Sequence, residues 1–155
     1  MNEQTNYVVG LLFSTDGRYV LLMRKNRPKW QAGKLNGIGG KIEAGETALQ
    51  AMDRETEEEV GLVDVKWQPV VRLTGQGFSV YFFRAFSLEQ IENAVQKTDE
   101  GVTIEETFAV VGSSDLIPNI HWILAMAVDP CIELPLIVKD AATMLSDEFF
   151  PWQGD

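Results

Sequence analysis

The sequence is organised around the stretch GKIEAGETALQAMDRETEEEVGL, residues 40–62. Its second part predicts a helix over Thr47–Val60. Thr47 and Gln50 have the spacing of a capping box, in which each side chain satisfies a free backbone N–H of the first turn. Gly61 follows where a helix commonly ends in a left-handed residue. A helix preceded by a glycine-rich segment is therefore the starting point for interpreting the rest of the chain.

The predicted helix is unusually acidic at its carboxyl end, since residues 53–59 hold five carboxylates and only Arg54 to offset them. The helix dipole disfavours negative charge there. At about 100° per residue, Glu55, Glu58 and Glu59 share one arc of roughly 100°. The adjoining stripe is expected to face the core and consists of Leu49, Met52, Thr56 and Val60. Such a trio raises its pKa values or binds a cation, Mg²⁺ or Mn²⁺ being the natural choice; the alternative is a solvated, glutamate-rich helix surface.

Four glycines lie within nine residues just before this helix, between Gly37 and Gly45. Glycines permit tight turns and close approach of the backbone to a ligand. A carbonyl in this segment can add a hard oxygen to a metal, and Lys41 can meet phosphate oxygens as a point charge. The spacing matches neither a P-loop nor a dinucleotide-binding fingerprint.

Together these residues resemble the Nudix box, G-x5-E-x7-R-E-U-x-E-E-x-G-U, where U is apolar. Every fixed residue is present at the right spacing from Gly40 to Leu62, and Thr56 at an aliphatic position is the one departure. Upstream, residues 34–41 look like the MutT-type and oxidised-purine nucleotide hydrolases. The resemblance implies an α/β (α+β) fold, the Nudix α/β/α sandwich around a mixed β-sheet, with residues 1–155 as one domain.

The resemblance also assigns roles within the box. Glu58 and Glu59 would hold Mg²⁺ or Mn²⁺, with Glu55 as a further ligand or as the base and the carbonyl of Gly39 completing the coordination. Arg54 would orient the glutamates, and Glu46 would be structural at the junction of loop and helix. In some members the base comes from a later loop, for which Glu100 is the first candidate and Glu105 and Glu106 are alternatives.

Substrate contacts are expected from several segments, each with a structural alternative. Arg24 or Lys25, after the second strand, would contact phosphates together with Lys41. Asn36 matches a base-reading asparagine of the oxidised-purine hydrolases or serves the turn. Asn119 would hydrogen-bond a base on which Trp122 stacks; the alternative makes Asn119 a helix cap and Trp122 part of the core.

Outside the box the pattern predicts further strands and helices and thus a layered α/β or α+β domain. The predicted strands are 7–13, 19–23, 65–73, 78–86 and 107–111. The predicted helices are 88–96, 119–128 and a short one at 140–146.

Composition limits the partners. A net charge of -10 argues against binding nucleic-acid polymers, and an anionic substrate then needs a screening cation. One cysteine and one histidine exclude a cysteine or histidine metal cluster and disfavour a Ser-His-Asp triad. The N-terminus lacks a signal-peptide pattern and no run reaches a membrane span, so a cytoplasmic protein without membrane contact is expected. Many members of the family dimerise, which leaves a homodimer open, although no interface signature is visible.

The expected activity is Mg²⁺-dependent hydrolysis of a canonical or oxidised nucleoside triphosphate to the monophosphate and pyrophosphate. The alternative is a pyrophosphatase acting on ADP-ribose, another nucleotide sugar or a dinucleotide. A non-catalytic ligand sensor of the same fold is disfavoured because the box is intact.

Overall fold

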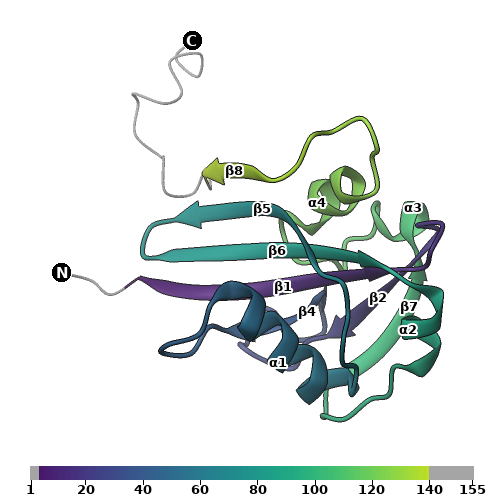
Figure 1. Ribbon diagram of the computed structural model, residues 1–155, viewed down its shortest axis with the longest axis horizontal. Helices are drawn as coiled ribbons and strands as arrows, with labels where there is room; N and C mark the ends of the chain where they lie inside the picture. Colours follow the sequence, from purple (N-terminus) through teal and green to yellow (C-terminus); the bar gives the residue numbers. More distant parts are fainter. Residues whose placement is uncertain (1–3, 140–155) are drawn as a thin grey trace.

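Residues 4–139 are described by the computed structural model of the chain, and they form an eight-stranded mixed sheet with helices on both faces (Figure 1). The sheet runs in the order β3-β2-β1-β6-β5-β8, with β4 paired to β1 and β7 paired to β2. The β1–β6 and β5–β8 pairs are parallel and the others antiparallel. The strands are β1 Thr5–Phe13, β2 Tyr19–Arg24, β3 Leu35–Asn36, β4 Ile38–Lys41, β5 Gln68–Gly75, β6 Phe78–Phe86, β7 Gly101–Glu106 and β8 Leu136–Lys139.

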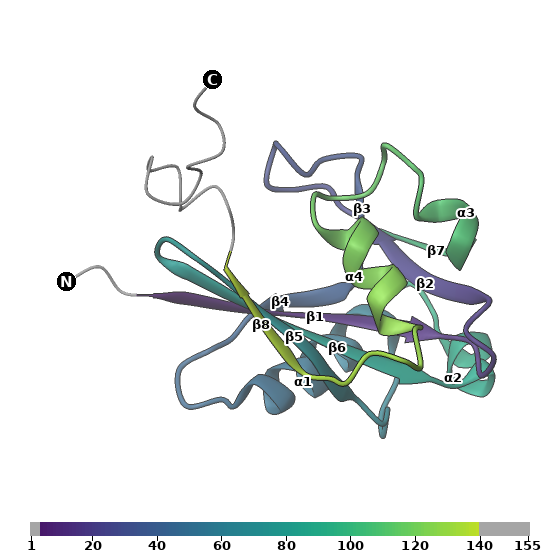
Figure 2. The ribbon, with the colours of Figure 1, turned by 90° about the horizontal axis from the view of Figure 1, so that it is seen from above.

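The helices complete the layers on either side. They are α1 Ala48–Val60, α2 Leu88–Asn93, α3 Thr107–Val110 and α4 Ile120–Ala127. Helix α1 covers one face of the sheet and α4 the opposite face (Figures 1 and 2). The expected α/β/α sandwich around a mixed sheet is confirmed.

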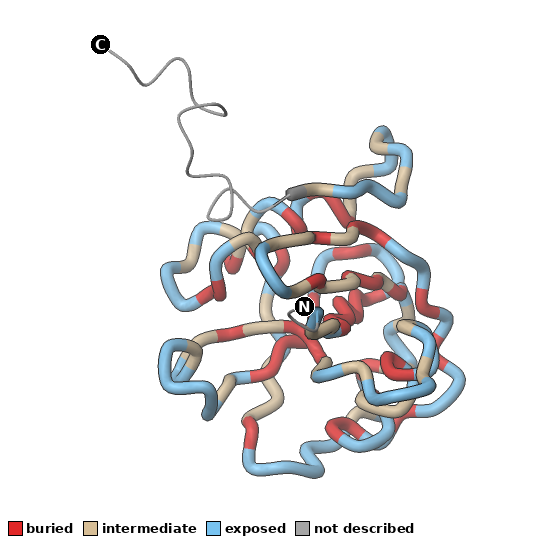
Figure 3. The backbone as a smooth tube through the Cα atoms, turned by 90° about the vertical axis from the view of Figure 1, so that its left-hand side faces the viewer, coloured by how far each residue is buried: buried red, intermediate tan, exposed pale blue. Residues whose placement is uncertain are grey.

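Strand β1 lies between the two hydrophobic cores and contributes side chains to both, which explains its continuous apolar sequence. Val9, Leu11 and Phe13 pack in the cluster that includes α4, whereas Val8 and Leu12 pack in the cluster that includes α1. Successive side chains of a strand point to opposite faces, so a strand covered on both faces needs apolar residues at every position. Burial accordingly follows the central strands, and the loops are exposed (Figure 3).

Helix α1 begins and ends as the sequence predicts. The reciprocal Thr47–Gln50 capping box is present, and Gly61 has φ of 69°. Leu49, expected in the core stripe, is instead 47% exposed, and Ala51 is fully buried. The buried side of α1 therefore lies closer to the glutamates than the core stripe that the sequence predicts. Helix and sheet approach closely here, because a β-carbon on Gly10 of β1 would overlap the side chain of Met52.

Several predicted elements are wrong. Residues 107–110 form α3 and not a strand. The strand in this region is β7, which ends just before Thr107, whose hydroxyl donates a hydrogen bond to the carbonyl of Gly17. At this edge of the sheet none of the residues of β7 is fully buried, so the sequence carries little apolar pattern there. Strand β8 was not predicted, β5 begins at Gln68 and not at residue 65, and α2 ends at Asn93. The helix predicted at 140–146 lies outside the described residues.

Candidate active site

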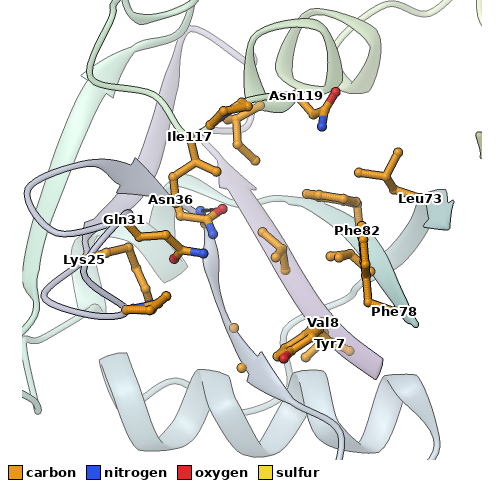
Figure 4. Close-up of a pocket in the computed structure, with 18 of the residues that line it drawn as sticks. Tyr7, Val8, Lys25, Gln31, Asn36, Leu73, Phe78, Phe82, Ile117 and Asn119 are labelled. Carbon is orange, nitrogen blue, oxygen red and sulfur yellow. Dashed lines mark hydrogen bonds between the residues drawn. The ribbon is translucent and has the colours of Figure 1, made fainter. Parts of the chain in front are cut away.

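A cavity of about 530 Å³ opens between the loop of residues 25–34, the sheet and the start of α4 (Figure 4). One end is formed by Gly39, Gly40 and Lys41 of β4, next to α1. The other end is apolar and is lined by Leu73, Val80, Ile117 and the rings of Phe78 and Phe82. The cavity thus joins a polar backbone surface near the acidic helix to a surface suited to a flat apolar group.

Arg54 is the centre of the ion-pair network at the polar end. Its Nε lies 2.7 Å from Glu46 Oε2 and its Nη2 lies 2.9 Å from Glu46 Oε1, a bidentate pair. Its Nη1 reaches Glu55 Oε1 at 2.9 Å and Glu58 Oε2 at 3.3 Å, and Nη2 also donates to the carbonyl of Lys41 at 3.1 Å. The hydrogen bond from Arg54 is the main reason why the pKa of Glu46 falls to about 2. One guanidinium therefore ties the loop, β4 and α1 together.

Glu59 and Glu55 occupy the interior of this network. Glu59 is 8% exposed and accepts a hydrogen bond from the backbone N–H of Gly39 at 3.2 Å. Burial raises the pKa of Glu59 to about 7 and also raises the pKa of Glu55. The Glu55 carboxylate lies against Gly40, where a β-carbon would collide with it. Two carboxylates are thus held with incomplete solvation, an arrangement that a cation would stabilise.

Glu58 differs from the other two, because its side chain is 56% exposed. Among residues 4–139, no group of three or more His, Cys, Asp or Glu side chains is gathered closely enough to hold a metal ion. The predicted trio shares one side of α1, but Arg54 lies between Glu55 and Glu58 as their counter-ion. By donor chemistry these glutamates and the backbone oxygens beside them fit a hard divalent cation such as Mg²⁺ or Mn²⁺.

Glu100 is brought to the same region by strand register. β2 and β7 are antiparallel, and Arg24 at the end of β2 lies opposite Gly101 at the start of β7. Lys25, which follows β2, therefore lies beside Glu100, which precedes β7. Lys25 Nζ lies 3.0 Å from Glu100 Oε2, and Asn26 Nδ2 donates to the carbonyl of Asp99 at 3.0 Å. Glu100 is close enough to Glu59 to raise its pKa. By contrast, Glu105 and Glu106 pair along β2 at Val20 and Tyr19.

The phosphate-contact candidates divide according to where their side chains lie. Lys25 and Lys41 line the cavity. Arg24 does not line it, because its Nη1 donates to the carbonyl of Gly33 at 2.6 Å inside the loop. Asn36 lines the cavity, and its Oδ1 also accepts from the N–H of Gly37 at 2.8 Å, so the base-reading and turn roles are compatible.

Asn119 and Trp122 take different positions at the start of α4. Asn119 lines the cavity, adopts φ of 78° and makes no side-chain cap hydrogen bond to the helix. Trp122 is not among the cavity-lining residues and is 37% exposed. Its indole N–H donates to Asn119 Oδ1 at 2.8 Å. Trp122 therefore contacts the Asn119 amide, but it does not line the cavity in which its ring is expected to stack on a base.

Sequence reasoning missed the apolar wall of the cavity. Phe78, Val80 and Phe82 alternate along β6, a period that places them on one face. That alternation was visible in the sequence, although nothing in it distinguishes a cavity wall from core. Trp30, which lines the cavity from the loop, is 61% exposed.

Comparison with known proteins decides the family. The model described as NUDIX domain matches residues 4–122, well over half of the chain. The chain belongs to the Nudix family. This Nudix protein carries every fixed residue of the box and is a hydrolase acting on pyrophosphate bonds.

Solved structures share the Nudix fold at low sequence identity. A MutT structure from a study of the Aliivibrio salmonicida and Vibrio cholerae proteins is 23% identical, covers 79% of this chain and 98% of its own, and has a TM-score of 0.65. A Nudix hydrolase from Nitrosomonas europaea is 18% identical, with coverages of 90% and 81% and a TM-score of 0.66. A MutT protein from Methanosarcina mazei Go1 is 17% identical, with coverages of 80% and 92% and a TM-score of 0.62.

No curated protein matches this Nudix chain. Within residues 4–139 the helices are all too short or too polar to cross a membrane.

Proposed function

We propose that this Nudix hydrolase cleaves nucleoside triphosphates, canonical or oxidised, to the monophosphate and pyrophosphate, with Mg²⁺ or Mn²⁺ as cofactor. The observation that carries the proposal is the cavity, whose apolar end continues directly into the glycine backbone of β4 beside α1. A base fits between apolar side chains, and the phosphates then extend towards the acidic network.

The base end supports a purine read by neutral amides. Phe78 and Phe82 line this end with aromatic rings on which a base could stack, and Asn36 and Asn119 line it with amide groups. Leu73, Val80 and Ile117 exclude water around the base. A neutral edge that presents a donor next to an acceptor, as a purine does, suits these side chains better than a charged group does.

The polar end supports metal-assisted attack on phosphorus. Glu55, Glu58, Glu59 and the carbonyl of Gly39 would hold the cation, with Arg54 orienting the glutamates. When bound there, a divalent cation would supply neutralisation of phosphate charge, polarisation of phosphorus and a lower pKa for the attacking water. Lys25 and Lys41, which both line the cavity, would bind phosphate oxygens.

A carboxylate must accept the proton of the attacking water. Glu100 is the preferred base because it lies near Glu59 and is 9% exposed, which keeps it within the site. Glu55 is the second candidate, because burial raises its pKa and a carboxylate with a raised pKa accepts a proton more readily. Replacing each by glutamine and comparing the pH profiles of turnover separates them, since only loss of the base removes the acid limb.

A substrate panel tests the proposed reaction. Canonical and oxidised nucleoside triphosphates are compared with ADP-ribose and dinucleotides by steady-state assays that score pyrophosphate against phosphomonoester release. The triphosphates are expected to give the highest kcat/KM and to release pyrophosphate. Activity confined to ADP-ribose would overturn the proposed substrate class and leave the alternative, while inactivity on every compound would favour a ligand sensor.

A further inference from the structure

Lys25 is a nearly buried cation among carboxylates. The side chains of Lys25 and Glu100 are only 14% and 12% exposed, and their charged atoms are 3.0 Å apart. The charge of Lys25 also acts on Glu55 and Glu59 of α1. Removing an ammonium from water is unfavourable unless its partners compensate. The ammonium therefore belongs to the acidic network and is not a solvated loop charge.

Position makes this lysine a competitor for a metal ion. A divalent cation and the ammonium both seek the carboxylate oxygens of the same residues, and two cations so close repel each other. Lys25 also lines the cavity together with Gly39 and Gly40. Its ammonium sits on a flexible four-carbon stem, so it can leave Glu100 and reach a phosphate without backbone movement.

We propose that Lys25 is a positioning residue that serves as a tethered counter-ion, holding Glu100 and shielding the α1 glutamates until substrate and metal arrive together. Lys25 then moves to a phosphate oxygen and leaves the carboxylates to the metal. The proposal rests on the proposed metal-dependent function. It implies weak metal affinity in the free protein and stronger affinity with nucleotide bound, and the coupling is reciprocal.

The direct test is Mn²⁺ binding to the nucleotide-free protein, followed by the electron paramagnetic resonance signal of free Mn²⁺. Lys25→Gln is expected to bind Mn²⁺ about five-fold or more tightly than wild type, because a nearby positive charge is gone. Lys25→Arg, which keeps the charge, should retain wild-type affinity. Lys29→Gln is the matched control: it makes the same change in net charge in the same loop, at an exposed side chain.

A second measurement uses α,β-methylene-dGTP, which cannot be hydrolysed at that bridge. In wild type this probe should raise Mn²⁺ affinity by more than it does in Lys25→Gln, since only wild type exchanges the lysine from carboxylate to phosphate. Equal enhancement in both proteins would contradict the exchange.

The amide of Lys25→Gln can still donate to Glu100, which favours folding of the variant. Wild-type protein supplies an independent readout, namely the rate at which an amine-reactive ester labels Lys25, measured by mass spectrometry with Lys29 as internal reference. Mg²⁺ at a concentration high enough to occupy the weak site of the nucleotide-free protein should displace the ammonium, which accelerates labelling of Lys25 and leaves Lys29 unchanged. No acceleration at that concentration would contradict displacement.

The outcomes separate this proposal from the proposed function. Normal Mn²⁺ binding by wild type with equal or weaker binding by Lys25→Gln would refute the role of the lysine alone. No Mn²⁺ binding by wild type would refute the metal site itself, and the role of Lys25 with it.

Discussion

Arg54 donates two parallel hydrogen bonds to Glu46, from Nε to Oε2 at 2.7 Å and from Nη2 to Oε1 at 2.9 Å. The two residues are eight positions apart, one in the loop before α1 and one inside the helix. A planar guanidinium fits a carboxylate in this way with little freedom to rotate. The pair thereby fixes the direction in which Arg54 presents its remaining N–H groups to Glu55 and Glu58.

The first prediction concerns Glu46 and pH. A carboxyl whose pKa falls to about 2 on folding contributes stability above its unfolded value near 4.5, and this contribution is lost as pH falls towards 2. Glu46→Gln should therefore unfold at lower urea concentration than wild type at pH 7, and the difference should shrink steadily between pH 4.5 and 2.5. Glu57→Gln, at an exposed position of α1, is the control and should show no such convergence. A pH-independent difference would contradict the ion-pair explanation.

The second prediction replaces Arg54 by lysine. The ammonium keeps the charge but cannot make the fork with Glu46 and also reach Glu55 and the carbonyl of Lys41. We expect kcat to fall about 10- to 100-fold, as for other groups that orient metal ligands, with a smaller change in KM. Steady-state kinetics at saturating Mg²⁺ measures both. Wild-type kcat in this variant would show that charge alone suffices.

The third prediction uses the contact between Gly40 and Glu55. A β-carbon at position 40 would collide with the Glu55 carboxylate, so Gly40→Ala must push that side chain out of place. Displacement of about 1 Å commonly costs up to ~100-fold in rate, and we expect a 10- to 100-fold loss of kcat by this estimate. Gly112→Ala is the matched control, since a β-carbon there meets nothing within 4 Å. Full activity of Gly40→Ala would place Glu55 outside the reaction.

The sequence was sufficient for α1 because local rules determine it. Capping by Thr47, termination at Gly61 and the helical period depend only on neighbours in the chain, and the structure has all three. The degree of burial of each glutamate was not predictable in the same way. Glu59 is buried and Glu58 is exposed because β4 approaches one side of α1, a relationship that helical angles alone do not contain.

Contacts between residues far apart in the sequence account for the other differences between the sequence-based predictions and the structure. The partnership of Lys25 with Glu100 depends on the register between β2 and β7, and β7 has too little apolar pattern to be recognised as a strand. The choice between Arg24 and Lys25 as the residue facing the cavity follows from the same register. A strand alternates its side chains, so an error of one position exchanges the inside and outside residues.

The fourth prediction concerns the metal. Excess chelator should abolish turnover, and addition of Mg²⁺ or Mn²⁺ should restore it. Glu58→Gln should leave the unfolding transition close to that of wild type, because its side chain is 56% exposed, yet lower kcat by about 1,000-fold if it contributes several kcal/mol through the metal. Glu57→Gln is again the neighbouring control. Turnover that survives both chelator and Glu58→Gln would refute the metal assignment.

The fifth prediction concerns base selectivity and the indole of Trp122. Its N–H donates to Asn119 Oδ1, and Asn119 lines the cavity, so this hydrogen bond contributes to the orientation of the amide there. Trp122→Phe keeps an aromatic ring at a half-exposed position and removes only this donor. Loss of one such hydrogen bond is worth about 1 kcal/mol, so the kcat/KM ratio between the best nucleotide and its poorest competitor should fall about five-fold. Asn119→Ala supplies the control: in that background Trp122→Phe should change the ratio no further. A drop of equal size with and without Asn119 would mean that Trp122 acts through packing of α4 and not through the amide.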